Sequence, residues 1–188
     1  LDAGGFRLLR LDDTGIIQWD RSWKSASPEG DVLSGIAVDQ AGSVYAAGPE
    51  GGAHGYATIA YDADGAFLFH DHESGSHDTA ITDALIAAHP EGGVVVSASP
   101  ETTCGEFEVR TWRLNSDGQR LWNVVGPDKL CNSNSFGPTA LAVAPDGHIA
   151  VGSGLVFSTG WRIFLYTPSG DLEWIAQWMN PNSSGESP

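Results

Sequence analysis

The stretch Ala37-Val38-Asp39-Gln40-Ala41-Gly42-Ser43-Val44-Tyr45-Ala46-Ala47-Gly48 decides the fold, because its pattern occurs three times in the chain. The second copy runs from Ala87 to Ala98, and the third from Ala142 to Ser153. Each copy joins two runs of small or β-branched residues through a turn that contains Gly, which is typical of a β-hairpin. A hairpin that returns every 50 to 55 residues predicts a repeat protein.

A second kind of hairpin follows the first and occurs four times. Its copies span Phe6 to Trp19, Tyr56 to Phe69, Val109 to Trp122 and Trp161 to Trp174. The turn glycines of successive copies lie 50, 53 and 52 residues apart. Gly readily adopts the positive φ that tight reversals need, so both kinds of hairpin are expected to turn at glycines, namely Gly15, Gly42, Gly65, Gly92, Gly118, Gly147 and Gly170. We name the strands of the first kind A and B, and those of the second kind C and D.

The alternation of A/B and C/D hairpins predicts an all-β protein of four-stranded antiparallel units. No stretch of the sequence has convincing helical periodicity. A four-stranded repeat of about this length is typical of the blades of a β-propeller. We expect one propeller segment over residues 1–188, with a half blade (a C/D hairpin) and its connection at 1–30, blades at 31–79 and 80–135, and a blade with a trailing connection at 136–188.

About 3.5 blades form only a partial ring, because propellers typically need four to eight blades to close. The chain is therefore expected to begin in mid-blade and to end in a connection between blades. Further blades from the rest of a longer chain, or from another copy, are expected partners that complete the ring.

An aromatic residue stands four positions after each C/D turn glycine. A large ring at a fixed place in every repeat fits a stacked architecture, in which each unit buries one face against the next. The alternative role is a platform for a cofactor. The predicted blade-packing residues are Trp19, Phe69, Trp122 and Trp174.

The repeats also resemble known families. Gly35 to Gly48 resembles the bacterial secreted β-propeller repeat, which has a strand, an Asp-x-x-Gly turn and a Val-Tyr strand ending in Gly. The C/D hairpins, with Tyr61-Asp62-Ala63-Asp64-Gly65, are similar to repeats of quinoprotein-type propellers. The resemblance implies the propeller fold, which hosts enzymes, binding modules and structural proteins alike. The sequence has no vicinal Cys pair and no clear set of quinone-binding residues, so the resemblance is not extended to redox activity.

The composition limits the partners and the location. There are 24 acidic and 9 basic residues among 188, which gives a net charge of −15. This charge repels phosphates, so nucleic acid is excluded as an expected partner. No run approaches the roughly 20 apolar residues that span a bilayer, so no transmembrane segment is expected. Many Gly and Trp residues with little Lys favour a secreted, periplasmic or cell-surface bacterial protein.

The two cysteines fall in loops of the same blade. Cys104 lies in the expected B/C loop, and Cys131 in the D/A loop that follows. Propeller topology places these loops at one end of the blade, which we call the loop face, and the A/B and C/D turns at the other, the turn face. A disulfide between Cys104 and Cys131 is therefore predicted, with two free thiols as the alternative.

Four histidines gather near the loop face of the preceding blade, namely His54, His70, His72 and His77. Side chains alternate along a strand, so His70 and His72 share one side. Imidazole and nearby carboxylates are ligands for zinc or another divalent metal. The alternative is a set of solvated polar loops. No cofactor other than this candidate metal is predicted. His89 and His148 fall in A/B turns, where a surface role is expected.

Three arginines, Arg7, Arg110 and Arg162, each stand eight residues before a C/D turn glycine. We expect them to contact neighbouring blades or acidic side chains, and the alternative is a ligand-binding ring. The sequence contains no recognisable nucleophile elbow and no phosphate-binding loop, and no catalytic residue is predicted.

The predicted function is that of a non-catalytic extracytoplasmic propeller, acting as a structural surface or binding a protein or glycan on its loop face. The alternative is a propeller enzyme, either a quinoprotein-like oxidoreductase or a lyase or hydrolase, with its site among the B/C and D/A loops.

Overall fold

The computed structural model describes residues 4–27, 30–51, 55–75, 83–100, 108–126, 135–155 and 160–179. Over these residues the secondary structure consists of fourteen strands and contains no helix. The strands form three four-stranded sheets and one two-stranded sheet, in which all neighbouring strands are antiparallel. The prediction of an all-β fold of four-stranded antiparallel blades is confirmed. Within the described ranges, no helix is long and apolar enough to cross a membrane.

Each sheet follows the order of the chain, with the strand order A, B, C, D in the complete blades. Blade 0 contains only a C/D hairpin, β1 (Phe6–Leu11) and β2 (Ile17–Trp23). Blade 1 contains β3 (Gly35–Val38), β4 (Val44–Glu50), β5 (Gly55–Tyr61) and β6 (Phe67–Ser74). Blade 2 contains β7 (Leu85–Ala88), β8 (Val94–Ala98), β9 (Arg110–Leu114) and β10 (Arg120–Val125). Blade 3 contains β11 (Ser135–Val143), β12 (Ile149–Leu155), β13 (Gly160–Tyr166) and β14 (Leu172–Met179).

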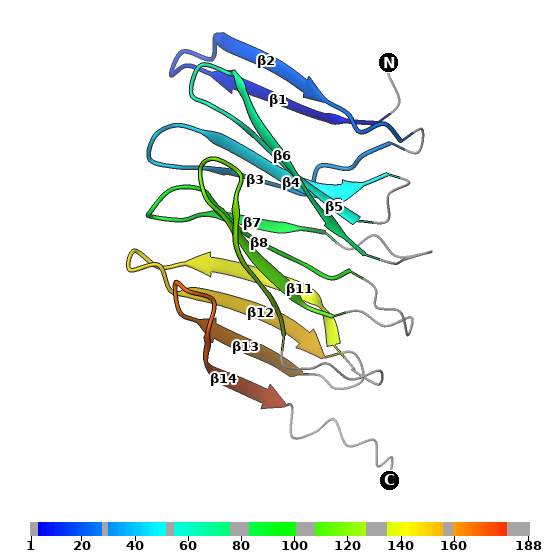
Figure 1. Ribbon diagram of the computed structural model, residues 1–188, viewed down its shortest axis with the longest axis vertical. Helices are drawn as coiled ribbons and strands as arrows, with labels where there is room; N and C mark the ends of the chain where they lie inside the picture. Colours follow the sequence, from blue (N-terminus) through cyan, green and yellow to red (C-terminus); the bar gives the residue numbers. More distant parts are fainter. Residues whose placement is uncertain are drawn as a thin grey trace.

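The blades stack face to face in chain order, with blade 0 at the top of Figure 1 and blade 3 at the bottom. The A strand of blade 2, β7, contacts the A strands of both neighbours, β3 and β11. The hairpin turns lie together on the left of the view. This is the arrangement of part of a β-propeller, in which successive A strands stand side by side and the turns share one face.

Local sequence explains the turns. All seven predicted turn glycines have φ between 80° and 89°, a region that strains residues with a Cβ. The residue three positions before each C/D glycine fastens the turn with its side chain. In blade 1, Asp62 Oδ1 accepts hydrogen bonds from the backbone N–H groups of Asp64 at 2.9 Å and Ala66 at 2.8 Å. Asp12, Asn115 and Thr167 accept equivalent backbone bonds.

The hydrophobic core is divided among the junctions between blades. One cluster fills each of the three junctions, and each combines residues from the two facing sheets. Every residue of β5 and β8 is buried, because these central strands are covered on both faces. The outermost strand β14, by contrast, is exposed along almost its whole length.

Candidate functional site

A ring on each blade covers a turn of the next blade. A Cβ placed on Gly65 would lie 2.8 Å from the ring of Trp19, and one on Gly118 would lie 2.5 Å from that of Phe69. Trp122 covers Gly170 in the same way at 2.8 Å. Three of the four predicted blade-packing rings therefore lie against a turn glycine where only a residue without a Cβ fits.

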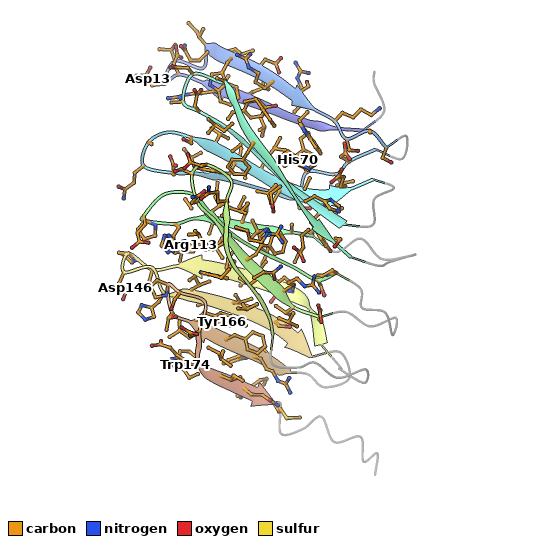
Figure 2. All side chains as sticks on the ribbon, viewed as in Figure 1. Asp13, His70, Arg113, Asp146, Tyr166 and Trp174 are labelled. Carbon is orange, nitrogen blue, oxygen red and sulfur yellow. The ribbon has the colours of Figure 1, made fainter. Side chains whose placement is uncertain are left out.

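The two tryptophans also bond to the turns that they cover. Trp19 Nε1 donates to the carbonyl of Ala63 at 3.1 Å, and Trp122 Nε1 to that of Pro168 at 3.0 Å. An arginine reinforces each bond, because Arg10 donates to the Ala63 carbonyl and Arg113 to the Pro168 carbonyl. The fourth ring, Trp174, lies at the end of the stack and is 46% exposed. Figure 2 shows it at the bottom of the molecule.

A charged cluster crosses the junction between blades 1 and 2. The carboxylate of Glu73, on β6, accepts hydrogen bonds from the guanidinium groups of Arg110 and Arg120 and from Asn123 Nδ2 at 3.1 Å. Arg120 also donates to Asp71 Oδ2 at 2.5 Å. Glu73 is only 4% exposed, so this cluster holds a charge inside the protein.

Electrostatics keeps Glu73 ionised. Burial on its own raises the pKa of a carboxyl group, because it disfavours the charged form. Hydrogen bonds and the positive charges of Arg110 and Arg120 outweigh this effect and hold the pKa of Glu73 below its usual value. The cluster therefore acts as a polar clamp between two blades.

The three equivalent arginines have different partners. Arg110 bridges two blades through Glu73. Arg7 pairs with Asp20 of its own hairpin at 2.6 Å, and Arg162 Nε donates to Gln177 Oε1 at 2.8 Å. Of the two expected kinds of contact, the one with a neighbouring blade forms at Arg110. The one with an acidic side chain forms at both Arg7 and Arg110.

His70 and His72 converge on Glu50, at the edge of the junction with blade 0. His72 Nδ1 lies 2.8 Å from Glu50 Oε2, and His70 Nε2 lies 3.5 Å from the same oxygen. The His70 ring also packs on Trp23, with ring centroids 4.8 Å apart. Both ring nitrogens thus face the same carboxylate oxygen.

The structure brings two of the four predicted metal ligands together. His54 and His77 lie outside the described residues, and so do both cysteines of the predicted disulfide, Cys104 and Cys131. Among the described residues, no group of three or more His, Cys, Asp and Glu side chains is arranged to hold a metal ion. The metal site and the disulfide both stay predictions.

A cleft of about 590 Å³ opens on the loop face beside blade 0. It is lined by Phe6 and Trp23 and by the charged residues Arg7, Asp20 and Lys24. Two backbone stretches, Gly4 and Gly5 on one side and Ser22 on the other, complete the lining. Aromatic surface with a few polar groups, in a cleft of this size, is typical of a ligand-binding site.

His89 is buried at the turn face, where a surface role was expected. It is 2% exposed, with its ring against Gly147 of blade 3. Its Nδ1 accepts a hydrogen bond from the N–H of Glu91 at 3.2 Å. Burial, aided by the nearby charge of Arg113, lowers the pKa of His89. The expectation was wrong because the neighbouring blade covers this turn. His148, in the next A/B turn, is partly exposed and contacts Asp146.

Sequence reasoning considered Glu73, with Asp71 and Asp78, only as a carboxylate near the candidate metal site, and it missed Glu50. Glu73 stands four residues after the ring of Phe69, where blades 0 and 3 have Trp23 and Trp178. The sequence signal for Glu73 was an acidic residue at a position that is tryptophan in blades 0 and 3. Glu50 carries no comparable signal, because its partners come from a different strand.

Comparison with known proteins shows similarity in structure but not in sequence. No family model and no curated protein sequence matches this chain. Among solved structures, the chain is similar to a quinoprotein alcohol dehydrogenase-like protein from Bacteroides thetaiotaomicron, with a TM-score of 0.41 and 12% identity. That match covers 77% of this chain and 33% of the other.

Proposed function

We propose that this chain is a non-catalytic extracytoplasmic propeller module whose loop face binds a protein or glycan, and that a glycan fits best. The cleft beside blade 0 is the observation that carries the proposal. Sugar rings stack on aromatic surface, and their hydroxyl groups pair with charged and hydroxyl side chains. The partly exposed Trp23 supplies apolar surface, while Arg7, Asp20 and Lys24 supply hydrogen-bonding groups.

Two further observations support binding without catalysis. The Arg7–Asp20 pair lines the cleft with side chains that are 66% and 38% exposed, so both can reach a ligand. The buried carboxylates of Glu73 and Asp31 are instead engaged by neighbouring residues. An extracytoplasmic location is supported by the acidic, Lys-poor composition.

The test measures the affinity of the protein for soluble oligosaccharides of bacterial surface glycans, with Trp fluorescence as the signal. We expect Arg7→Ala to weaken binding at least about tenfold, since a lost charged hydrogen bond has about that effect. Arg162→Ala removes the equivalent arginine of blade 3 and is expected to leave the affinity unchanged. Equal loss in both variants, or no glycan bound at about millimolar concentration, would overturn the glycan assignment. Capture of a protein partner by the wild type but not by Arg7→Ala would keep the cleft and change its ligand.

A further inference from the structure

Blade 3 ends the stack with an exposed aromatic face. Trp161, Trp174 and Trp178 are 45%, 46% and 46% exposed. The strand register places all three on one side of the sheet. Trp161 pairs with Trp178, and Leu165, four residues further along the same strand, pairs with Trp174. Side chains an even number of residues apart share a face. The rings of Trp161 and Trp178 are stacked, with centroids 6.4 Å apart and planes inclined by 18°. We call this surface the tryptophan face.

The same three positions are aromatic in blade 0, where a following blade covers them. Phe6, Trp19 and Trp23 precede Trp161, Trp174 and Trp178 by 155 residues each. Phe6 and Trp19 are only 1% and 6% exposed, and they belong to the core shared with blade 1. Phe6 and Trp23 also form a ring pair, with centroids 5.2 Å apart. The tryptophan face is therefore a junction surface of the kind that blade 0 uses.

At the opposite end of the stack, the outer surface of blade 0 has a turn glycine that no ring covers and exposed apolar side chains. Among the described residues, no atom lies within 4 Å of a Cβ placed on Gly15, whereas rings cover the equivalent glycines of the other three blades. Leu9, Leu11 and Ile17 of blade 0 are 48%, 54% and 56% exposed. The equivalent positions in blade 1 include Ile59 and Tyr61, which are buried against blade 0.

We propose that the tryptophan face of one copy docks on blade 0 of a second copy. Trp174 then covers Gly15 of the second copy and donates from Nε1 to the Asp13 carbonyl. The internal junctions supply this geometry, because Trp19 and Trp122 donate to carbonyls two residues before the glycines that they cover. Asp13 stands two residues before Gly15. Figure 2 shows Asp13 and Trp174 at opposite ends of the stack, so the contact joins two molecules.

Two copies joined at both ends form a closed ring. Each chain brings four C/D hairpins, so a dimer provides eight blade positions, within the four to eight of closed propellers. A head-to-tail contact that closes yields a discrete oligomer and not a fibre. The charge of −15 per chain opposes association, so we expect screening by salt to strengthen the dimer. Arg7 of the cleft and Leu9 of the docking surface lie on one face of β1, and Leu9 pairs with Asp20, so a ligand in the cleft is expected to compete with the dimer.

The native mass of this chain tests the inference directly. By light scattering at about 100 µM, we expect twice 19.8 kDa, with a larger dimer fraction in about 0.5 M than in about 0.05 M NaCl. Trp174→Ala is expected to raise the dissociation constant at least about tenfold, as for a buried aromatic at the centre of an interface. The matched control is Leu68→Ala, because Leu68 is 42% exposed on an inner blade. Far-UV circular dichroism checks that both variants fold.

A variant designed to tighten the dimer distinguishes specific docking from nonspecific association. Arg10 and Arg113 donate to the same carbonyls as their tryptophans, and Leu165 holds the equivalent position in blade 3. We expect Leu165→Arg to tighten the dimer several-fold, and Leu68→Arg, with the same change in charge, to do so by much less. A monomer at about 100 µM, an unchanged mass for Trp174→Ala, or a monomer whose tryptophan face binds an oligosaccharide would each overturn the inference. Open-ended oligomers would overturn the closed ring.

Discussion

The indole ring of Trp122 lies directly over Gly170, so that a Cβ at Gly170 would fall 2.8 Å from the ring. Phe69 and Gly118 repeat the contact at the previous junction. Gly65, Gly118 and Gly170 therefore each have two roles, because each adopts a positive φ and also leaves room for the ring of the preceding blade. Within one chain, Gly15 has the same backbone conformation without a ring above it, so the two roles can be measured separately at concentrations where the protein is monomeric.

We predict that Gly118→Ala destabilises the protein far more than Gly15→Ala. Both substitutions put a Cβ at φ close to 80°, at a cost of about 1 to 2 kcal/mol. Only Gly118→Ala also forces a methyl group against Phe69, which adds about 1 to 3 kcal/mol of overpacking. Urea unfolding measures the difference. Equal losses in the two variants would mean that the ring moves aside without cost.

The clamp at Glu73 leads to a second prediction. Glu73→Gln leaves Arg110 and Arg120 facing a neutral amide in a buried place, and we expect a loss of about 3 kcal/mol in the free energy of unfolding. Asp20→Asn breaks the exposed pair with Arg7 and serves as the control, with an expected loss of less than about 1 kcal/mol. Comparable losses in both variants, measured by urea unfolding, would show that burial of Glu73 does not make the clamp stronger than a surface pair.

The fold was predictable because its determinants recur. Ring and glycine return at fixed offsets, as in Trp19 with Gly15 and Trp122 with Gly118, so the sequence alone locates hairpins, turns and packing rings. What the offsets could not reveal is which blade a ring touches. The ring of Trp19 covers Gly65 of the next blade, not the glycine of its own hairpin.

The polar clusters were harder to predict because each depends on side chains from different strands. Glu73 binds arginines that lie 37 and 47 residues further along the chain. The positions equivalent to Glu73 in the other blades are Trp23, Gly126 and Trp178, so the repeat does not predict this acid. His89 looked like a turn residue until the adjacent blade was seen to cover it. Burial at a junction is a property of two blades, and the sequence of one blade does not contain it.

The His70–Glu50–His72 cluster gives a third prediction. His72→Ala removes a hydrogen-bonding partner of Glu50, whose side chain is only 11% exposed, so we expect a loss of about 1 to 2 kcal/mol of stability. Among the described residues no three ligands are arranged to hold a metal ion, so added Zn²⁺ is expected to leave the melting temperature of the wild type unchanged. The control is His148→Ala, at a partly exposed turn. A rise in melting temperature with about one equivalent of bound Zn²⁺ would instead establish the predicted metal site.

The buried imidazole of His89 predicts a pH-dependent stability. Burial lowers the pKa of His89 in the folded protein below the value near 6.5 of an unfolded chain. The unfolded state then binds a proton first as the pH falls. The stability that His89 contributes is fully present above about pH 6.5 and is lost as the pH falls toward the lower pKa of the folded state.

His89→Asn isolates this contribution from the other titrating groups. Asn115 fastens the neighbouring C/D turn with its side-chain oxygen, and an Asn at 89 is expected to accept the N–H of Glu91 without titrating. Between about pH 7.5 and 5.5, we expect the melting temperature of the wild type to fall relative to that of His89→Asn. The charges facing His89 are those of Arg113 and Glu91, and the hydrogen bond and charge of Arg113 hold the pKa of Glu91 below its usual value. Parallel pH profiles for the two proteins would show that His89 takes up its proton equally in the folded and unfolded states, which would contradict the effect of its burial between blades 2 and 3.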